Sequence, residues 1–200
     1  MYRELVFDCA ERVFAEQGFE ETAMHDIAAE AGVSLNTVYA AFAGKNELYD
    51  EIRRVRGHAF LEAMVVALHE AGSIRERLAR GCRGYVDFLL AHRDFFQLLL
   101  REGRSWGLDP APESRVDWGE GLRVVADLLR DGMAEGVFYD GDPDRMAATG
   151  FAIMQVQLAG LLASEESVDA DAIANEIQEI LERVYCRPGV REKAPRRLAV

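Results

Sequence analysis

The chain has 200 residues, half of them hydrophobic, which is enough for one sizeable core or for a small module joined to a larger one. Taken alone, the formal net charge of −12 argues against a nucleic-acid partner, and three widely spaced cysteines match neither a disulfide scaffold nor a metal-ligand spacing, so we expect a reducing cytoplasm and no metal. Asp8, Glu11 and Glu16 interrupt the first apolar stretch, which argues against the apolar core of a signal peptide.

Apolar residues recur with a helical period along the whole chain, and no β-alternation is long enough to predict a sheet. Glycines, prolines and capping residues divide this pattern into a series of expected helices. Their approximate spans are 5–17, 22–31, 34–43, 45–72, 73–92, 94–101, 115–135, 143–164 and 169–185. The predicted fold class is all-α, with three short helices followed by a bundle of longer ones.

The composition changes near residue 45, where short helices with tight turns give way to longer helices that hold most of the aromatic residues. We therefore expect a small domain over residues 1–45 and a larger helical domain over 46–186. The segment 103–114, GRSWGLDPAPES, is rich in turn residues and is predicted to be a loop. Residues 187–200 are basic and contain two prolines, so we expect a disordered tail.

One uncharged stretch, Met146 to Ser164, approaches the length needed to span a bilayer. It contains two glycines and two glutamines, and Arg145 and Glu165 flank it closely. These polar and small residues favour a buried helix in a core or an interface over a membrane span.

The stretch AGVSLNTVYAAFAGK, residues 31–45, has the residue order of a helix-turn-helix. Two helices that cross steeply need a small residue at their contact, a glycine for the left-handed turn and a branched apolar residue where the second helix packs back. Ala28, Gly32 and Val38 supply these three types in order. Ser34 is placed to cap the second helix, as Thr22 is for the first.

The second helix of such a unit presents its exposed side to the DNA major groove. Asn36 can hydrogen-bond a base edge, and Thr37 can contact a phosphate or a thymine methyl group. The Tyr39 hydroxyl suits a phosphate oxygen. Lys45 opens the next helix, where its charge and the free backbone amides together favour a second phosphate.

The segment from Leu5 to Ile52 resembles the DNA-binding domain of the TetR family of transcriptional regulators. The matching elements occur in the family's order: AERVFAEQGFEETAMHDIA, AGVS, TVY, F and K. The remaining three quarters of the chain is similar only in its helical layout, as expected for the family's variable ligand-binding and dimerisation domain.

The resemblance implies a cytoplasmic homodimer that binds a pseudo-palindromic double-stranded operator, usually as a repressor released by a small molecule. By position it assigns phosphate contacts to Thr22, Tyr39 and Lys45. It assigns base-facing positions to four further residues: Ser34, Leu35, Asn36 and Thr37. No cofactor and no membrane partner are implied.

Residues 1–50 carry three Lys or Arg residues against ten Asp or Glu residues. Glu20 and Glu21 adjoin Thr22, and no basic arm precedes the first helix. We therefore expect modest DNA affinity with a shallow salt dependence.

Aromatic residues of the larger domain could line an apolar ligand cavity closed by the loop 103–114. The expected ligand contacts are Phe95, Trp106, Trp118, Phe151 and Gln155. On the uncharged helix, Gly150, Ile153, Gln157 and Gly160 share another side, which we assign to close helix packing across a dimer.

Enzyme motifs find little support in this sequence, because GxSxG, HExxH and P-loop patterns are absent and GEGLRV at Gly119 lacks the third glycine of a dinucleotide fingerprint. The four histidines are scattered without ligand spacing, so we expect no catalytic residues and no metal site. A protein-interaction adaptor of the same fold that has lost operator binding stays open as the alternative, favoured by the acidic first domain and by Ala41.

Overall fold

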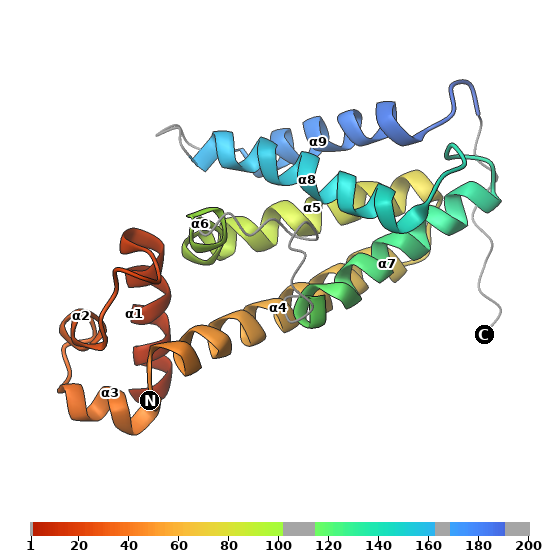
Figure 1. Ribbon diagram of the computed structural model, residues 1–200. Helices are drawn as coiled ribbons and strands as arrows, with labels where there is room; N and C mark the ends of the chain where they lie inside the picture. Colours follow the sequence, from red (N-terminus) through yellow and green to blue (C-terminus); the bar gives the residue numbers. More distant parts are fainter. Residues whose placement is uncertain (1, 102–114, 163–168, 191–200) are drawn as a thin grey trace. The chain divides into compact units, whose positions relative to one another are not determined.

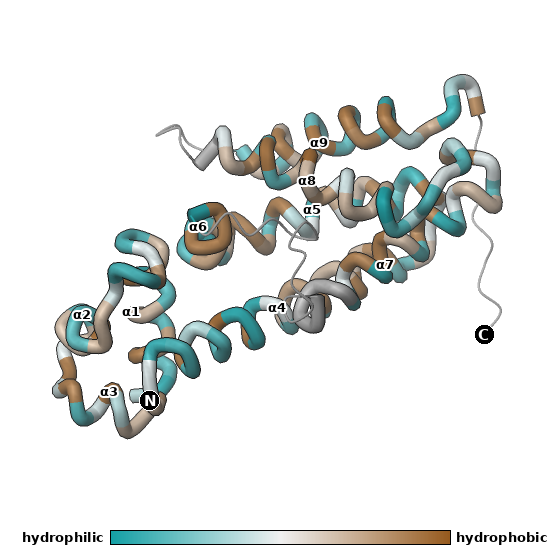
Figure 2. Tube along the Cα trace, in the orientation of Figure 1, coloured by the Kyte–Doolittle hydropathy of each residue, from teal (hydrophilic) through white to brown (hydrophobic). Residues whose placement is uncertain are grey.

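The computed structural model describes residues 2–101, 115–162 and 169–190, and within these ranges the chain forms nine helices and no strand (Figure 1). The helices are α1 (Tyr2–Gln17), α2 (Met24–Glu30), α3 (Leu35–Ala41), α4 (Lys45–His69), α5 (Ile74–Ala91), α6 (Arg93–Arg101), α7 (Arg115–Ala134), α8 (Pro143–Leu162) and α9 (Ala170–Tyr185). Hydrophobic and hydrophilic residues alternate along them, as amphipathic packing requires (Figure 2). The all-α prediction is confirmed.

Capping residues set the helix ends close to where the sequence predicts them. Ser73 begins α5 with a reciprocal cap, because its hydroxyl accepts the Glu76 N–H at 3.3 Å and the Glu76 carboxylate accepts the Ser73 N–H at 2.8 Å. Asp169 caps α9 by accepting the N–H groups of Asp171 and Ala172. Both helices begin one residue after the start of their predicted spans, 73–92 and 169–185.

The start of α2 differs from the prediction. Ala23 occupies the N-cap position in place of Thr22, and its backbone N–H donates to the Asp26 carboxylate at 2.8 Å. The Thr22 hydroxyl instead donates to the Gly18 carbonyl at 2.7 Å, which closes the turn after α1. Because this side chain points back toward α1, the helix begins one residue later than expected.

The chain divides into two compact units. The first contains α1, α2, α3, the part of α4 up to Ala59, and α6. The second contains the rest of α4 from Phe60, most of α5, and the helices α7, α8 and α9. Helix α6 packs against α1, so the compact unit around the helix-turn-helix takes in more of the chain than residues 1–45.

The core of the second unit is aromatic. The Phe60 ring lies 5.9 Å from Tyr85, 5.2 Å from Phe88 and 5.9 Å from Phe151, measured between ring centroids. Helix α8 packs on α7 and on α9. The ring contacts join three helices, α4, α5 and α8, around one cluster.

Close packing between α8 and α9 occurs at Gly150. A Cβ atom there would lie 2.7 Å from the Tyr185 hydroxyl oxygen, and that hydroxyl donates to the Met146 carbonyl at 2.7 Å. Gly150 therefore faces a helix of its own chain, which corrects its assignment to the dimer side, whereas a Cβ at Gly160 would meet nothing within 4 Å.

A short bridge pairs Phe138 with Cys186. Arg187 continues it, since its N–H donates to Val137 and its Nε donates to the Phe138 carbonyl at 2.9 Å. The rest of the predicted tail, 191–200, lies outside the described residues.

No helix in the described part of the chain is long and apolar enough to cross a bilayer. Cys9, Cys82 and Cys186 are buried thiols. Burial raises the pKa of Cys82 to about 12, which keeps this thiol protonated and unreactive.

Candidate DNA-binding face and ligand pocket

The turn between α2 and α3 has the geometry that a helix-turn-helix requires. Gly32 has a φ of 63°, a left-handed conformation that glycine adopts without strain. The Val33 N–H donates to the Ala28 carbonyl at 3.1 Å and so closes the end of α2. Ala28 and Val38 are buried, as their pattern predicts.

Helix α3 is held by its N-cap residue and by one buried apolar residue. The Ser34 hydroxyl accepts the Thr37 N–H at 3.1 Å, and the two hydroxyls lie 2.8 Å apart. Val38 is the residue of α3 that is fully buried. A short helix fixed at these points leaves most of its side chains facing outward.

The predicted base-facing residues lie on this outward side. Ser34 and Asn36 are exposed, Leu35 is 39% exposed, and Thr37 is partly exposed. Tyr39, the predicted phosphate contact, is 50% exposed. The structure thus places these five side chains on one short helix and its cap, within reach of an outside partner.

Lys45 begins α4 but also bonds within the unit. Its ammonium donates to the carbonyls of Phe19 at 2.7 Å and Glu20 at 3.0 Å, and it lies 4.6 Å above the Phe19 ring. An ammonium has three N–H donors, so one is left for a phosphate. These bonds hold the start of α4 beside the turn that precedes α2.

Thr22, the remaining predicted phosphate contact, is 2% exposed. Its hydroxyl proton is used by the Gly18 carbonyl, which leaves only the oxygen as an acceptor. A phosphate offers acceptors, so the phosphate contact of Thr22 stays a prediction that calls for a local rearrangement.

The other two cations of the first fifty residues also have internal partners. Arg12 pairs with Glu30 at 2.7 Å, which joins α1 to α2. Arg3 donates to the Ala41 carbonyl at the end of α3, pairs with Glu51 and stacks 4.0 Å from the Phe42 ring. The basic residues among the first fifty positions therefore make contacts within the first unit itself.

A buried ion pair links α1 to α4. The Glu11 carboxylate accepts from Arg56 Nε at 2.9 Å and from Nη2 at 2.5 Å. The side chain of Glu11 is 7% exposed and that of Arg56 is 18% exposed. Sequence reasoning missed this pair, because the two residues are 45 positions apart and nothing in the local pattern marks Glu11 as buried.

The predicted ligand residues fall in different places. Phe151 and Gln155 lie one turn apart on α8 and are buried in the second unit, with Phe151 5.7 Å from Tyr85. Phe95 is fully buried on α6, in the first unit. Trp106 lies outside the described residues, and Trp118 lies in a part of α7 whose side chains are not described.

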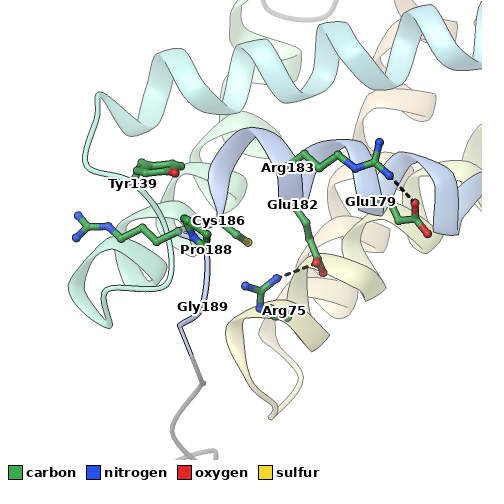
Figure 3. A pocket seen from close by; sticks show the side chains of 9 residues that line it. Arg75, Tyr139, Glu179, Glu182, Arg183, Cys186, Pro188 and Gly189 are labelled. Atoms are coloured by element: carbon green, nitrogen blue, oxygen red, sulfur yellow. Dashed lines mark hydrogen bonds and ion pairs between the residues drawn. The ribbon is translucent and has the colours of Figure 1, made fainter.

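A separate hollow of about 470 Å³ opens beside the end of α9 (Figure 3). Its charges are paired: Arg75 with Glu182 at 2.8 Å and Arg183 with Glu179 at 3.1 Å. Of the predicted ligand residues whose side chains the structure describes, none lines it. An open, charged hollow of this kind does not suit an apolar ligand.

Residues 6–52 match the family model described as "Bacterial regulatory proteins, tetR family". The chain is 22% identical over 177 residues to the fatty acid metabolism regulator protein of Bacillus subtilis (strain 168), covering 88% of this chain and 91% of that one. It is 23% identical to the HTH-type transcriptional activator FasR of Mycolicibacterium smegmatis, over 82% of this chain and 73% of the relative.

Solved structures share the fold. The ketosteroid transcriptional regulator KstR2 of Mycobacterium tuberculosis superposes with a TM-score of 0.79 at 21% identity, covering 94% of this chain and 96% of that one. The fatty acid degradation regulator FadR of Bacillus halodurans gives 0.75 at 20% identity, covering 96% and 97%. At these identities the similarity establishes the architecture.

Proposed function

We propose that this chain, a TetR-family transcriptional regulator and not an enzyme, binds a pseudo-palindromic operator as a cytoplasmic homodimer and releases it when a small, largely apolar effector binds. The dimer would use the last two helices, with Gln157 and Gly160 of α8 facing the partner. We propose that binding to the operator represses transcription.

One observation carries the DNA-binding part of this proposal. Helix α3 is anchored by Val38 and capped by Ser34, while Asn36 and Tyr39 face away from the unit. A short helix that leaves amide and hydroxyl groups unburied is suited to the major groove, where base edges and flanking phosphates need such partners. Lys45 would add a phosphate contact at the start of α4.

The effector class is supported by the second unit and by the relatives. Phe60, Tyr85, Phe88 and Phe151 form an aromatic cluster beside the buried amide of Gln155 on α8. Two of the similar proteins are named for fatty acid metabolism or degradation. We therefore propose an acyl compound as the effector, with Gln155 as its polar contact and Phe151 as an apolar contact.

The proposed mechanism is a shift in population between two arrangements. Helix α4 contributes residues to both compact units, so a bundle state favoured by the effector would move the helix that leads to the reading domain. The two recognition helices of the dimer would then no longer match both half-sites at once.

The test begins with DNA from upstream of the chain's own gene, using footprinting and a binding titration. Wild-type protein should protect a palindrome, and Tyr39→Phe should weaken binding about three- to tenfold, as expected for one lost hydroxyl–phosphate hydrogen bond. Tyr139→Phe, an exposed tyrosine of the second unit, serves as the control and should bind as wild type does.

Adding a long-chain fatty acid to the bound complex should release the DNA, and Gln155→Leu should reduce that release without changing DNA affinity. Transcription from the footprinted promoter in a reconstituted assay decides the sign. A rise in transcript on adding wild-type protein would replace repression by activation, the role named for FasR.

The alternative function, a protein-interaction adaptor without operator binding, has support in the acidic first fifty residues and in Ala41, a small residue on the partly exposed side of α3. No protected palindrome, together with no selection of any duplex from a random pool, would favour the adaptor.

A further inference from the structure

Arg56 of α4 interacts with residues of two other helices in the first unit, α1 and α6. It extends from α4 to Glu11 on α1, with Asp8 3.9 Å away, and its guanidinium lies 5.2 Å from the Phe7 ring. Both ends of the Glu11 contact are fixed, because the fork of the guanidinium matches the two carboxylate oxygens.

The junction between α5 and α6 lies within the field of the same guanidinium. His92 stands at this junction, and its pKa is lowered first by burial and then by the Arg56 charge. Asp94, in the first turn of α6, also interacts electrostatically with Arg56. Helix α6 in turn packs against α1.

We propose that Arg56 is a positioning residue for operator binding: by tying α4 to Glu11 of α1 beside the start of α6, it holds the recognition helix at the orientation in which both half-sites are engaged. This inference rests on the proposed function, since it concerns how the same DNA-reading face is aimed.

Burial of Glu11 constrains the geometry of its ion pair with Arg56. A carboxylate removed from water must keep its partner, so Glu11 constrains where the Arg56 guanidinium, and hence this part of α4, can lie. The Arg12–Glu30 pair between α1 and α2 has side chains that are 48% and 39% exposed, and water can replace either partner there. The Glu11–Arg56 pair is therefore better able than the exposed Arg12–Glu30 pair to fix an angle between helices.

The experiment compares two DNA probes. One is the duplex that wild-type protein selects from a random-sequence pool, and the other is a single half-site cut from it. Arg56→Gln should lower the ratio of full-site to half-site affinity by about tenfold, with the half-site affinity changed less than about threefold. The control Glu30→Gln should leave the ratio unchanged.

A second variant separates positioning from folding. Glu11→Leu with Arg56→Met replaces the ion pair by apolar groups of similar volume, which preserves stability but removes the fixed geometry. We expect a melting temperature near that of wild type and the same lowered ratio as in Arg56→Gln. Equal losses at both probes, or an unchanged ratio in the double variant, would overturn the proposal.

A distance measurement keeps the test independent of DNA binding. Spin labels at Ala40→Cys on α3 and Val66→Cys on α4, in subunits diluted with unlabelled protein, report the orientation directly, because the native cysteines are buried. Arg56→Gln should broaden or shift the distance distribution. An unchanged distribution refutes the positioning role, whereas failure of wild type to select any duplex refutes only the proposed function.

Discussion

His92 links the charge state of one imidazole to the stability of the first unit, which contains the helix-turn-helix. Its pKa is lowered by burial and by the neighbouring Arg56 charge, so the unfolded chain takes up a proton at a higher pH than the folded chain. The stability that neutral His92 provides is complete above its unfolded pKa of about 6.5 and is lost as the pH falls from there toward the folded value.

We therefore expect the free energy of unfolding, measured with urea, to decrease over the pH range below about 6.5 more steeply in wild type than in His92→Gln. The variant has no proton to take up at this position, so the difference between the two curves isolates this imidazole. Parallel curves over that window would show that His92 titrates alike in the folded and unfolded chains.

Two glycines of α7 differ in how closely the surrounding chain approaches them. At Gly132 of α7, a Cβ atom would lie 2.2 Å from the Phe138 ring, whereas at Gly121 of the same helix the nearest atom, on the Phe60 ring, is 3.5 Å away. Gly132→Ala should destabilise the protein by roughly 1–3 kcal/mol, because overpacking outweighs the gain in helix propensity.

The same substitution at Gly121 should be neutral or stabilise by up to about 1 kcal/mol, since the contact there is ordinary and alanine favours the helix. Thermal or urea unfolding of the two variants measures both signs. Destabilisation of equal size at both sites would mean that backbone freedom, and not contact with Phe138, is the reason for glycine.

Element boundaries could be predicted from the sequence because they depend on neighbours in the chain. Ser34, Ser73 and Asp169 cap their helices through contacts two or three residues away, and Gly32 takes the left-handed turn that its position demands. Thr22 misled the prediction, since its hydroxyl donates to the Gly18 carbonyl and does not accept a backbone N–H at the start of α2. Local competition of this kind shifts a boundary by one residue.

Contacts between distant positions could not be predicted in the same way. Nothing near Glu11 in the sequence marks it as buried, and nothing near Gly150 shows that its neighbour is Tyr185 of the same chain. The placement of α6 with the reading unit likewise depends on packing against α1. The exposed side of α3 was easier, because one buried anchor, Val38, determines which side is left over.

The whole chain has a net charge of −12, which disfavours its approach to a polyanion such as DNA. Within residues 2–50 the two arginines are paired with carboxylates, and Lys45 bonds to two carbonyls. Few cations are therefore left to displace counterions from DNA. On the proposed function, hydrogen bonds from α3 and from backbone amides would supply most of the binding free energy.

This charge distribution predicts a shallow salt dependence of operator binding. If Lys45 is the cation that each subunit of the dimer brings to a phosphate, the logarithm of the association constant should fall with the logarithm of salt concentration with a slope of about −2. Lys45→Gln should flatten the slope toward zero, while Arg12→Gln, at a residue paired with Glu30, should leave it unchanged. A titration from low to moderate salt measures all three slopes. A wild-type slope of about −6 or steeper would mean that further cations reach the DNA, and that Arg3 or Arg12 leaves its internal partner when the complex forms.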